Sequence, residues 1–345
     1  MLGQDPRARG RPAMAKPARP RRAGEPTGAE ARDTKPGANA RASASPRLWQ
    51  LGGLAAIAAL AVGWALAARQ RRPPPARPGP PPESYPVWAA ARPGLVQPRQ
   101  LNVSCVPPEG GFPAGECGRP FRDGRCARLV VDGALPRAGV RAVRDMFAWL
   151  VAEAWGGGSG PPSVVDLHAG SISYKEAFVE LRKLMEFKQV EFSAEQVGAY
   201  LDVRDRIRRI IESKFGIPEN TLKHDMTFFS HINASKAAKT VHDEYWHTHI
   251  DTEQYGTFAF TALLYLNSQQ EDFDGGSFLF LPSSGGGEPV GVEPREGRLV
   301  IFTSGAENTH RVTRVTRGTR LALTSAFTCS EEAAAAIKPF PWPAE

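Results

Sequence analysis

Apolar positions recur at helical spacing in two stretches in the middle of the chain. Residues 138–155 bring large apolar side chains to one face, and three glycines at 156–158 then end the run. A second helix is predicted to begin at Ser193, where Gln196 completes a capping box, and to carry an apolar stripe over residues 197–211. Both stripes indicate helices that pack on a core, so we interpret them as structural supports and not as sites.

From residue 226 onward the pattern changes to short runs of β-branched and aromatic residues, separated by Gly, Pro, Asn and Asp. Runs of this length and spacing are typical of a β-sandwich or barrel. The predicted strands are residues 226–233, 246–252, 258–267, 277–281, 290–293, 298–303, 310–315 and 319–329.

One earlier segment is uncharged and largely apolar. Residues 48–68 lie between Arg47 and Arg69 and contain no charged residue. A helix of this length rises about 1.5 Å per residue and spans the hydrocarbon core of a bilayer, so the segment is predicted to be a transmembrane signal-anchor. A buried helix and a cleaved signal peptide are the alternatives, the second because residues 65–67 resemble a cleavage site.

The residues around this segment differ in composition from the rest of the chain. Residues 1–47 contain eleven of the 43 Lys and Arg residues and four of the 36 Asp and Glu residues. The rest of the chain therefore has 32 basic and 32 acidic residues. Residues 1–47 lack aromatic side chains and are predicted to be a disordered basic tail. Residues 69–98 are rich in Pro and are predicted to form an extended stalk. Because the remainder has no net charge, we expect no nucleic-acid partner.

Cysteines and glycosylation sequons predict the side of the membrane on which the C-terminal part lies. Both kinds of residue occur only after the apolar segment, which favours an oxidising, lumenal environment. Disulfides are the preferred interpretation, because cysteine spacings of 12 and 9 without a nearby His do not match a zinc cluster. We therefore expect a single-pass type II membrane glycoprotein of the endoplasmic reticulum or Golgi. The candidate disulfide cysteines are Cys105, Cys117, Cys126 and Cys329, and the asparagines of the two sequons are Asn102 and Asn233.

The candidate metal ligands lie in the strand-rich region. In a strand, positions i and i+2 project to the same face, so His249 and Asp251 can converge on one ion. An imidazole and a carboxylate suit iron(II), and a second imidazole completes such a site while leaving positions open. His310 begins a predicted strand 59 residues after Asp251 and is the expected third ligand. His247 is predicted to support the site without binding the metal.

A buried cation is predicted in the last strand. Gly318 is a candidate turn, and the strand that follows places Arg320 among small side chains on one face and bulky apolar side chains on the other. A guanidinium directed into a barrel interior needs an anionic partner, and a dicarboxylate provides one through paired hydrogen bonds. A surface arginine on an edge strand is the alternative. Tyr265 is a weaker candidate for contact with the same ligand, since a core tyrosine fits its position equally well.

Several motifs follow one another in an order that resembles the prolyl 4-hydroxylase-like branch of the 2-oxoglutarate/iron oxygenases, over roughly residues 223–330. The resemblance implies a double-stranded β-helix (jelly-roll) core with flanking N-terminal helices. Collagen-type prolyl hydroxylases have Lys where this chain has Arg320, which is more similar to lysyl hydroxylases, so the acceptor residue stays open. The motifs are His249-Ile250-Asp251, Leu264-Tyr265-Leu266-Asn267, Phe273-Asp274-Gly275-Gly276, Gly297 to Phe302, His310-Arg311-Val312 and Arg320.

The same resemblance implies a dioxygenase that uses Fe(II), 2-oxoglutarate and O2, with ascorbate keeping the iron reduced. Such an enzyme converts 2-oxoglutarate to succinate while it hydroxylates a substrate, here expected to be a protein of the secretory pathway. One alternative is a catalytically inactive lumenal jelly-roll that binds a glycan or a protein. Another is a zinc hydrolase, which would leave Arg320 without a purpose.

The predicted fold class is therefore α+β, with one transmembrane helix and a disordered tail before the folded region. Its predicted parts are residues 1–47 (cytosolic tail), 48–68 (signal-anchor), 69–98 (stalk), 99–222 (Cys-containing and helical support region), 223–330 (oxygenase core) and 331–345 (C-terminal tail).

Overall fold

A computed structural model of the chain describes residues 84–90, 98–153, 157–188, 191–282, 287–337 and 340. The predicted tail, the predicted signal-anchor and most of the predicted stalk lie outside these residues. Within the described part of the chain, no helix combines the length and the apolar character that crossing a bilayer requires.

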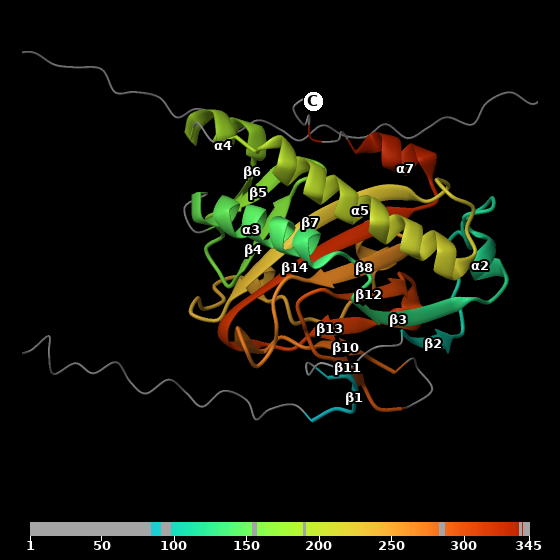
Figure 1. Cartoon of the computed structure of the whole chain (residues 1–345). Helices are drawn as coiled ribbons and strands as arrows, with labels where there is room; N and C mark the ends of the chain where they lie inside the picture. The colour runs from blue at the N-terminus through green and yellow to red at the C-terminus, as the bar shows by residue number, and fades with distance from the viewer. Residues whose placement is uncertain are drawn as a thin grey trace, which may run out of the picture. The chain divides into compact units, whose positions relative to one another are not determined.

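A long antiparallel sheet forms the centre of the fold, and Figure 1 shows it running beneath the helices. Strands from the C-terminal half occupy its middle, while strands that precede residue 181 extend it at both edges. In spatial order they are β2 (Arg99–Val103), β3 (Cys126–Asp132), β12 (Arg298–Thr303), β8 (Phe260–Tyr265), β14 (Val315–Thr328), β7 (Lys223–Asn233), β4 (Pro162–Asp166), β5 (Ser171–Tyr174) and β6 (Ala177–Glu180), with β9 (Phe273–Gly275) pairing to the start of β14.

A second, smaller sheet packs on one face of the first. Alternate residues of β8 and β12 face opposite ways: Leu263 and Phe302 join a cluster with Phe278 of the small sheet, whereas Leu264 and Ile301 join the helical core. The two sheets therefore enclose an interior, as in a β-sandwich. The strands of the small sheet are, in order, β1 (Val87–Ala89), β11 (Val290–Val292), β10 (Phe278–Phe280) and β13 (His310–Val312).

Helices cover the other face of the main sheet (Figure 1). The prediction of two amphipathic helices is confirmed by α3 (Arg137–Glu153) and α5 (Ala194–Phe215). Ser193 caps α5 with the predicted capping box, and the ring of Phe147 stacks 4.6 Å from that of Phe229 in the sheet below. The mixed α and β composition that was predicted is thereby confirmed. The remaining helices are α2 (Arg119–Arg122), α4 (Leu181–Lys188), α6 (Asp251–Tyr255) and α7 (Glu331–Ala336), with 3-10 turns η1 (Val241–Asp243) and η2 (Ala306–Asn308).

Two sequence predictions of local structure are wrong. Residues 246–252 do not form a strand: His249 makes one isolated bridge to His310, and Asp251 is the first residue of α6. Gly318 is not a turn but lies inside β14, where φ is +71°. A Cβ at Gly318 would come within 2.1 Å of the carbonyl oxygen of Asp272, which directly precedes the paired strand β9. Glycine is therefore needed at this position.

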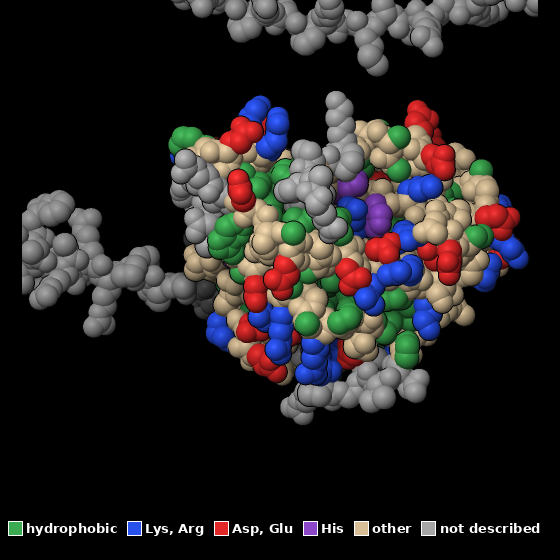
Figure 2. Space-filling model, turned by 45° about the horizontal axis from the view of Figure 1, so that its top comes forward, with side chains coloured by type: hydrophobic (Ala, Val, Ile, Leu, Met, Phe, Trp, Pro, Cys, Tyr) green, Lys and Arg blue, Asp and Glu red, His purple; other side chains and the backbone are tan. Residues whose placement is uncertain are grey.

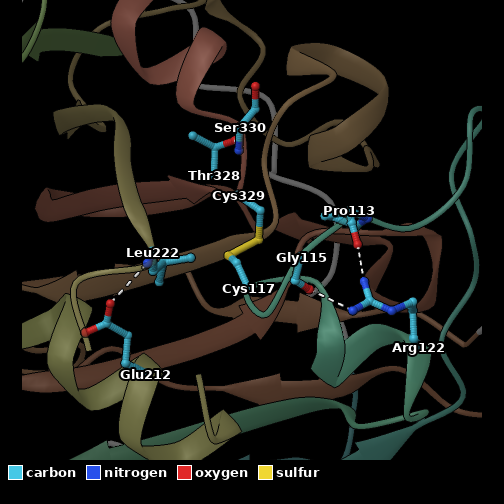
Figure 3. Close-up of a disulfide and its surroundings, with 9 residues drawn as sticks. All are labelled: Pro113, Gly115, Cys117, Arg122, Glu212, Leu222, Thr328, Cys329 and Ser330. Carbon is cyan, nitrogen blue, oxygen red and sulfur yellow. Dashed lines mark hydrogen bonds between the residues drawn. A yellow bond between two sulfur atoms is a disulfide. The ribbon is translucent and has the colours of Figure 1, made fainter. Parts of the chain in front are cut away.

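Residues 105–126 form a segment rich in Gly and Pro, and two disulfides tie it to the sheet. Cys105 pairs with Cys126 at the start of β3, and Cys117 pairs with Cys329 immediately after β14. Figure 3 shows the second bridge next to Thr328 and Ser330, with Arg122 donating to the carbonyl oxygens of Pro113 and Gly115 in the same loop. All four cysteines are thus paired. The segment that has little core of its own is fixed covalently to the strand that carries Arg320.

Charges of both signs are mixed on the surface. On the face drawn in Figure 2, blue Lys and Arg side chains lie among red Asp and Glu side chains. On α5, Arg206 pairs with Asp202 at 2.6 Å and Arg209 pairs with Asp205 at 3.1 Å. The expectation that the domain has no nucleic-acid partner stays a prediction.

Candidate metal centre and cosubstrate pocket

A cavity of about 210 Å³ opens between the two sheets. The three predicted metal ligands and Arg320 all line it, although they come from a loop, a helix and two different strands. Apolar and aromatic side chains make up most of the remaining wall, and they come from β4, β7, β8, β10, β12, α6 and the loop between α6 and β8. They include Val164, Phe228, Ile232, Tyr255, Phe258, Leu263, Phe278 and Phe302.

The side chains of His249, Asp251 and His310 converge on one point. Oδ1 of Asp251 lies 3.7 Å from Nε2 of His249 and 3.6 Å from Nε2 of His310. One ligand atom from each residue lies within 4.8 Å of the other two, a separation that suits three ligands of a single ion. Among the described residues this is the one group of three or more His, Cys, Asp or Glu residues with that geometry.

Backbone bonds bring the two histidines together. His249 and His310 exchange hydrogen bonds, each N–H donating to the other's carbonyl oxygen at 3.0 Å. This single bridge joins the first residue of β13 to the loop that precedes α6. Asp251 follows two residues later at the first position of the helix, so its carboxylate reaches the same point although the segment is not a strand.

Hydrogen bonds set the orientation of each candidate ligand. Nδ1 of His310 lies 2.8 Å from the carbonyl oxygen of Asn308, and Nδ1 of His249 lies 3.0 Å from that of His247. A carbonyl only accepts, so both Nδ1 atoms carry the proton and both Nε2 atoms present a lone pair. Thr261 donates to Oδ2 of Asp251 at 2.5 Å, which leaves Oδ1 for a metal.

The protonation state of His310 also suits metal binding. Burial lowers the pKa of His310 to about 4, and the nearby negative charge of Asp251 opposes this shift only in part. The imidazole is therefore neutral at pH 7, which is the form that binds metal ions. The rings of Phe278 and Phe302 pack against it at centroid distances of 4.8 Å and 5.0 Å and account for this burial.

Arg320 is buried in the same cavity, with 2% of its surface exposed. Its Nε donates to the carbonyl oxygen of Gly276 at 3.0 Å, while its Nη2 has no hydrogen-bond partner within the described part of the chain. Burial lowers the pKa of Arg320, which nonetheless stays cationic at neutral pH. A buried cation with an unsatisfied donor fits an anionic ligand. Arg320 is therefore chemically suited to the distal carboxylate of 2-oxoglutarate.

Tyr265 lies against Arg320 but not on the cavity wall. The guanidinium carbon is 5.3 Å from the centre of the tyrosine ring, and the ring itself is fully buried. Burial raises the pKa of Tyr265 to about 12, an effect that the charge of Arg320 partly opposes. Its hydroxyl also lacks a hydrogen-bond partner among the residues described. Contact between Tyr265 and the cosubstrate therefore stays a prediction, for a side chain that lies beside Arg320 and outside the cavity lining.

The glycine pair at 275 and 276 lies at the end of β9, where neighbouring atoms leave no room for a side chain. Both residues have positive φ, +73° and +67°. A Cβ on Gly276 would come within 2.8 Å of Cδ of Arg320, and one on Gly275 within 2.0 Å of the carbonyl oxygen of Arg314. The pair therefore leaves room for the arginine stem and for β14. This role follows from a tertiary contact, which a turn motif by itself does not indicate.

The other sequence candidates lie at the surface. His247 is exposed and pairs with Glu244 at 2.6 Å, so it contributes to the site only through its carbonyl oxygen. Arg314 stacks on the ring of Trp246 at 3.8 Å, and Arg317 pairs with Asp274 at 2.6 Å. Both arginines are exposed, and this distinguishes them from the buried Arg320 on the same length of chain.

The two sequons lie in different surroundings. Asn102 is exposed on β2, which is the edge strand of the main sheet. Asn233 ends β7, and its side-chain oxygen accepts hydrogen bonds from the backbone N–H and hydroxyl of Ser235 at 2.8 Å and 2.7 Å. Asn102 is the more accessible of the two.

Known proteins share the sequence of this domain. A model of the 2OG-Fe(II) oxygenase superfamily matches residues 235–328. A curated relative from Rattus norvegicus, named 2-oxoglutarate and iron-dependent oxygenase domain-containing protein 3, is 39% identical over 245 residues, which are 70% of this chain and 75% of the relative. Prolyl 3-hydroxylase 1 of Homo sapiens is 34% identical over 148 residues, which are 37% of this chain and 19% of that protein. Among solved structures, a prolyl-4-hydroxylase from Pseudomonas putida is 22% identical, covers 58% of this chain and 91% of its own, and has a TM-score of 0.41.

The match to the rat relative extends well beyond the oxygenase motifs, because it covers most of both chains. The superfamily match contains His249, Asp251, His310 and Arg320. The resemblance predicted from the order of the motifs is therefore confirmed by sequence identity. The chain belongs to the 2OG-Fe(II) oxygenase superfamily.

Proposed function

We propose that this protein is an active Fe(II)- and 2-oxoglutarate-dependent dioxygenase, which converts 2-oxoglutarate to succinate and hydroxylates a substrate. One observation carries the proposal: a three-residue set of metal-binding side chains and a buried arginine with an unsatisfied donor line a single cavity. A binding module without catalysis would have no need for a neutral imidazole, an oriented carboxylate and a buried cation in one small volume.

The side chains divide the work between metal and cosubstrate. Nε2 of His249, Nε2 of His310 and Oδ1 of Asp251 would hold the iron, which supplies the activation of O2 when it is bound. Three protein ligands leave the other coordination positions for small ligands. Arg320 would bind the distal carboxylate of 2-oxoglutarate and so fix its orientation relative to the metal ligands.

The cavity wall limits access of water to this chemistry. Leu263, Phe278 and Phe302 present hydrocarbon surface between the ligand set and the rest of the core. An apolar wall strengthens the charge interactions inside it and protects reactive species from side reactions. Tyr255 is 39% exposed and also lines the cavity, so α6 is the element beside which a substrate would enter.

The expected substrate is a protein of the secretory pathway, and the protein is expected to be anchored by residues 48–68 with its oxygenase domain in the lumen. Two disulfides and an exposed sequon at Asn102 support an oxidising compartment. One relative bears the name prolyl 3-hydroxylase, which supports a protein acceptor without fixing the residue. Ascorbate is expected to keep the iron reduced.

Succinate formation tests the proposed activity. The full chain in detergent would be supplied with Fe(II), ascorbate, O2 and 2-oxoglutarate, and succinate would be measured with and without extracts of secretory-pathway proteins. Wild-type protein should form succinate, Asp251→Ala should form none, and Arg317→Ala should match wild type because that arginine is exposed. Absence of succinate from iron-loaded wild-type protein in every condition would contradict the proposal.

Extracts that stimulate succinate formation would then be searched for proteins that gain one oxygen atom. A hydroxylated protein that requires Asp251 identifies the substrate. Stimulation without any oxidised protein would contradict a protein acceptor while leaving the oxygenase activity in place.

A further inference from the structure

A buried arginine from the N-terminal half of the domain reaches the metal centre. Arg128 lies on β3, two residues after the disulfide-bonded Cys126, and only 6% of its surface is exposed. β3 pairs with β12 so that Arg128 lies opposite Phe302, whose ring packs against His310. The arginine is therefore inserted beside a candidate metal ligand although 182 positions separate them in the sequence.

The guanidinium of Arg128 holds the 3-10 turn η2. Its Nε donates to Oδ1 of Asn308 at 2.7 Å, and its Nη2 donates to the carbonyl oxygen of Glu307 at 3.1 Å. Its Cζ also lies 4.4 Å from the ring centre of Phe280, which is the strand partner of His310. Two parallel donors and a flat stacking surface require a guanidinium, and a lysine does not reproduce this arrangement.

Asn308 connects Arg128 to the candidate metal ligand His310. Its carbonyl oxygen accepts from Nδ1 of His310 at 2.8 Å, which is the bond that directs Nε2 of the imidazole toward the metal position. Its side-chain amide donates to the carbonyl oxygen and hydroxyl of Thr303 at 2.8 Å and 2.9 Å. With 1% of its surface exposed, Asn308 has its position fixed from two sides, by Thr303 on β12 and by Arg128 on β3.

We propose that Arg128 is a positioning residue for the metal centre, which acts through Asn308 to hold the imidazole of His310 in its metal-binding orientation. The proposal rests on the proposed function only in requiring that the His249, Asp251 and His310 set binds a metal. It assigns a role in the site to a strand outside the residues that the superfamily model matches. Outer partners of this kind typically change metal affinity by about 10- to 100-fold.

A purely structural arginine provides the matched control. Arg298 lies on the adjacent strand β12, is fully buried, and forms hydrogen bonds to Asp132 and to three backbone carbonyl oxygens. It contacts neither η2 nor a candidate metal ligand through any of these bonds. Arg128→Met and Arg298→Met each remove a buried guanidinium and leave its acceptors unpaired, so both should lower thermal stability.

The test is the affinity of the full chain for Co(II), an air-stable substitute for Fe(II), measured by visible absorbance well below each variant's melting temperature. Arg128→Met should bind Co(II) about 10- to 100-fold more weakly and with an altered absorbance spectrum, whereas Arg298→Met should keep wild-type affinity. Arg128→Lys, which keeps the charge and is expected to fold more readily, should also bind weakly. Added guanidinium ion should partly restore binding to Arg128→Ala and leave Arg298→Ala unchanged.

Wild-type Co(II) affinity and spectrum in folded Arg128→Met or Arg128→Lys would overturn the positioning role and leave the proposed function intact. Equal loss of Co(II) affinity in Arg298→Met would overturn it too, because the effect would then follow from general destabilisation. Failure of wild-type protein to bind Co(II) would instead overturn the proposed function, and the positioning role with it.

Discussion

The hydroxyl of Thr261 donates to Oδ2 of Asp251 at 2.5 Å, so a residue of the main sheet orients the carboxylate that α6 carries into the cavity. The same hydroxyl lies 2.8 Å from that of Ser304, and all three side chains are buried. The carboxylate is thus held at one oxygen and free at the other, which is the arrangement that a monodentate metal ligand needs.

Replacing Thr261 by Val keeps the shape of the side chain and removes this hydrogen bond. We expect Thr261→Val to lower Co(II) affinity by about tenfold, in the range found for partners of metal ligands. Thr261→Ser retains the hydroxyl and should stay within about twofold of wild type. Titration with Co(II) measures both, and equal affinities for the Val and Ser variants would show that the hydroxyl has no role in metal binding.

Gly276 is predicted to be necessary for 2-oxoglutarate binding. In Gly276→Ala the new methyl group would collide with the stem of Arg320, so the guanidinium would be displaced and 2-oxoglutarate should bind at least about tenfold more weakly. Gly297→Ala is the control, because Gly297 has a similar φ of +78° but faces open space. Both variants lose about 1 kcal/mol or more from the strained backbone, so only their difference reports the contact with Arg320.

Isothermal titration with 2-oxoglutarate in the presence of Co(II) gives the two affinities. A Gly276→Ala variant that binds as tightly as Gly297→Ala would show that Arg320 tolerates the displacement or does not bind the cosubstrate.

The two disulfides should differ in what they contribute to stability. Cys117–Cys329 closes 212 positions of chain and Cys105–Cys126 closes 21. Loop-closure entropy predicts losses of about 5 kcal/mol and about 3 kcal/mol when each pair is replaced by Ser. Urea unfolding of the oxidised variants measures this difference. A larger loss for Cys105→Ser/Cys126→Ser would indicate that the shorter bridge fixes β3 by native-state contacts rather than by constraining the unfolded chain.

His168, which is buried, and His224, which is half-buried, should make the fold sensitive to acid. Burial, assisted by the charge of Arg204, lowers the pKa of His168 to about 4 and that of His224 to about 3. Both are neutral in the folded protein, whereas an unfolded histidine binds a proton below about pH 6.5. Their contribution to stability is therefore complete above pH 6.5 and is lost as the pH falls from there toward 4 and 3.

Replacing both histidines by Gln should flatten the pH dependence of the urea midpoint between pH 6.5 and 4. His247→Gln, at an exposed position, should leave the profile unchanged. Parallel profiles for the double variant and wild type would show that these two side chains do not control acid stability.

The convergence of the three candidate metal ligands could be predicted from sequence, although the reason given for it was partly wrong. An i, i+2 spacing places His249 and Asp251 together whether the segment is a strand or, as here, a bridged residue followed by the start of a helix. The burial of Arg320 could be predicted because it is the one charged residue in positions 319–328, among small and apolar side chains, and a buried cation needs an anionic partner. Both inferences use the spacing of residues that are close in the sequence, and this spacing limits where their side chains lie in the folded chain.

Contacts between distant segments were not predictable in the same way. β3 and β4 lie in a region expected to be Cys-containing and helical, yet β3 pairs with β12 and β4 pairs with β7. Nothing near Arg128 in the sequence indicates that it binds Asn308, because that contact depends on strand order in the sheet. The same limit applies to Gly276, whose contact with Arg320 follows from the antiparallel pairing of β9 with β14.

The proposed metal and cosubstrate roles are tested most directly by anaerobic titration of the metal-free full chain with Fe(II) and then with 2-oxoglutarate. We expect one Fe(II) per chain, no Fe(II) bound by Asp251→Ala or His310→Ala, and normal Fe(II) binding by Arg320→Ala with 2-oxoglutarate affinity reduced by about tenfold or more. Stoichiometric Fe(II) binding by Asp251→Ala, or wild-type 2-oxoglutarate affinity in Arg320→Ala, would contradict these roles.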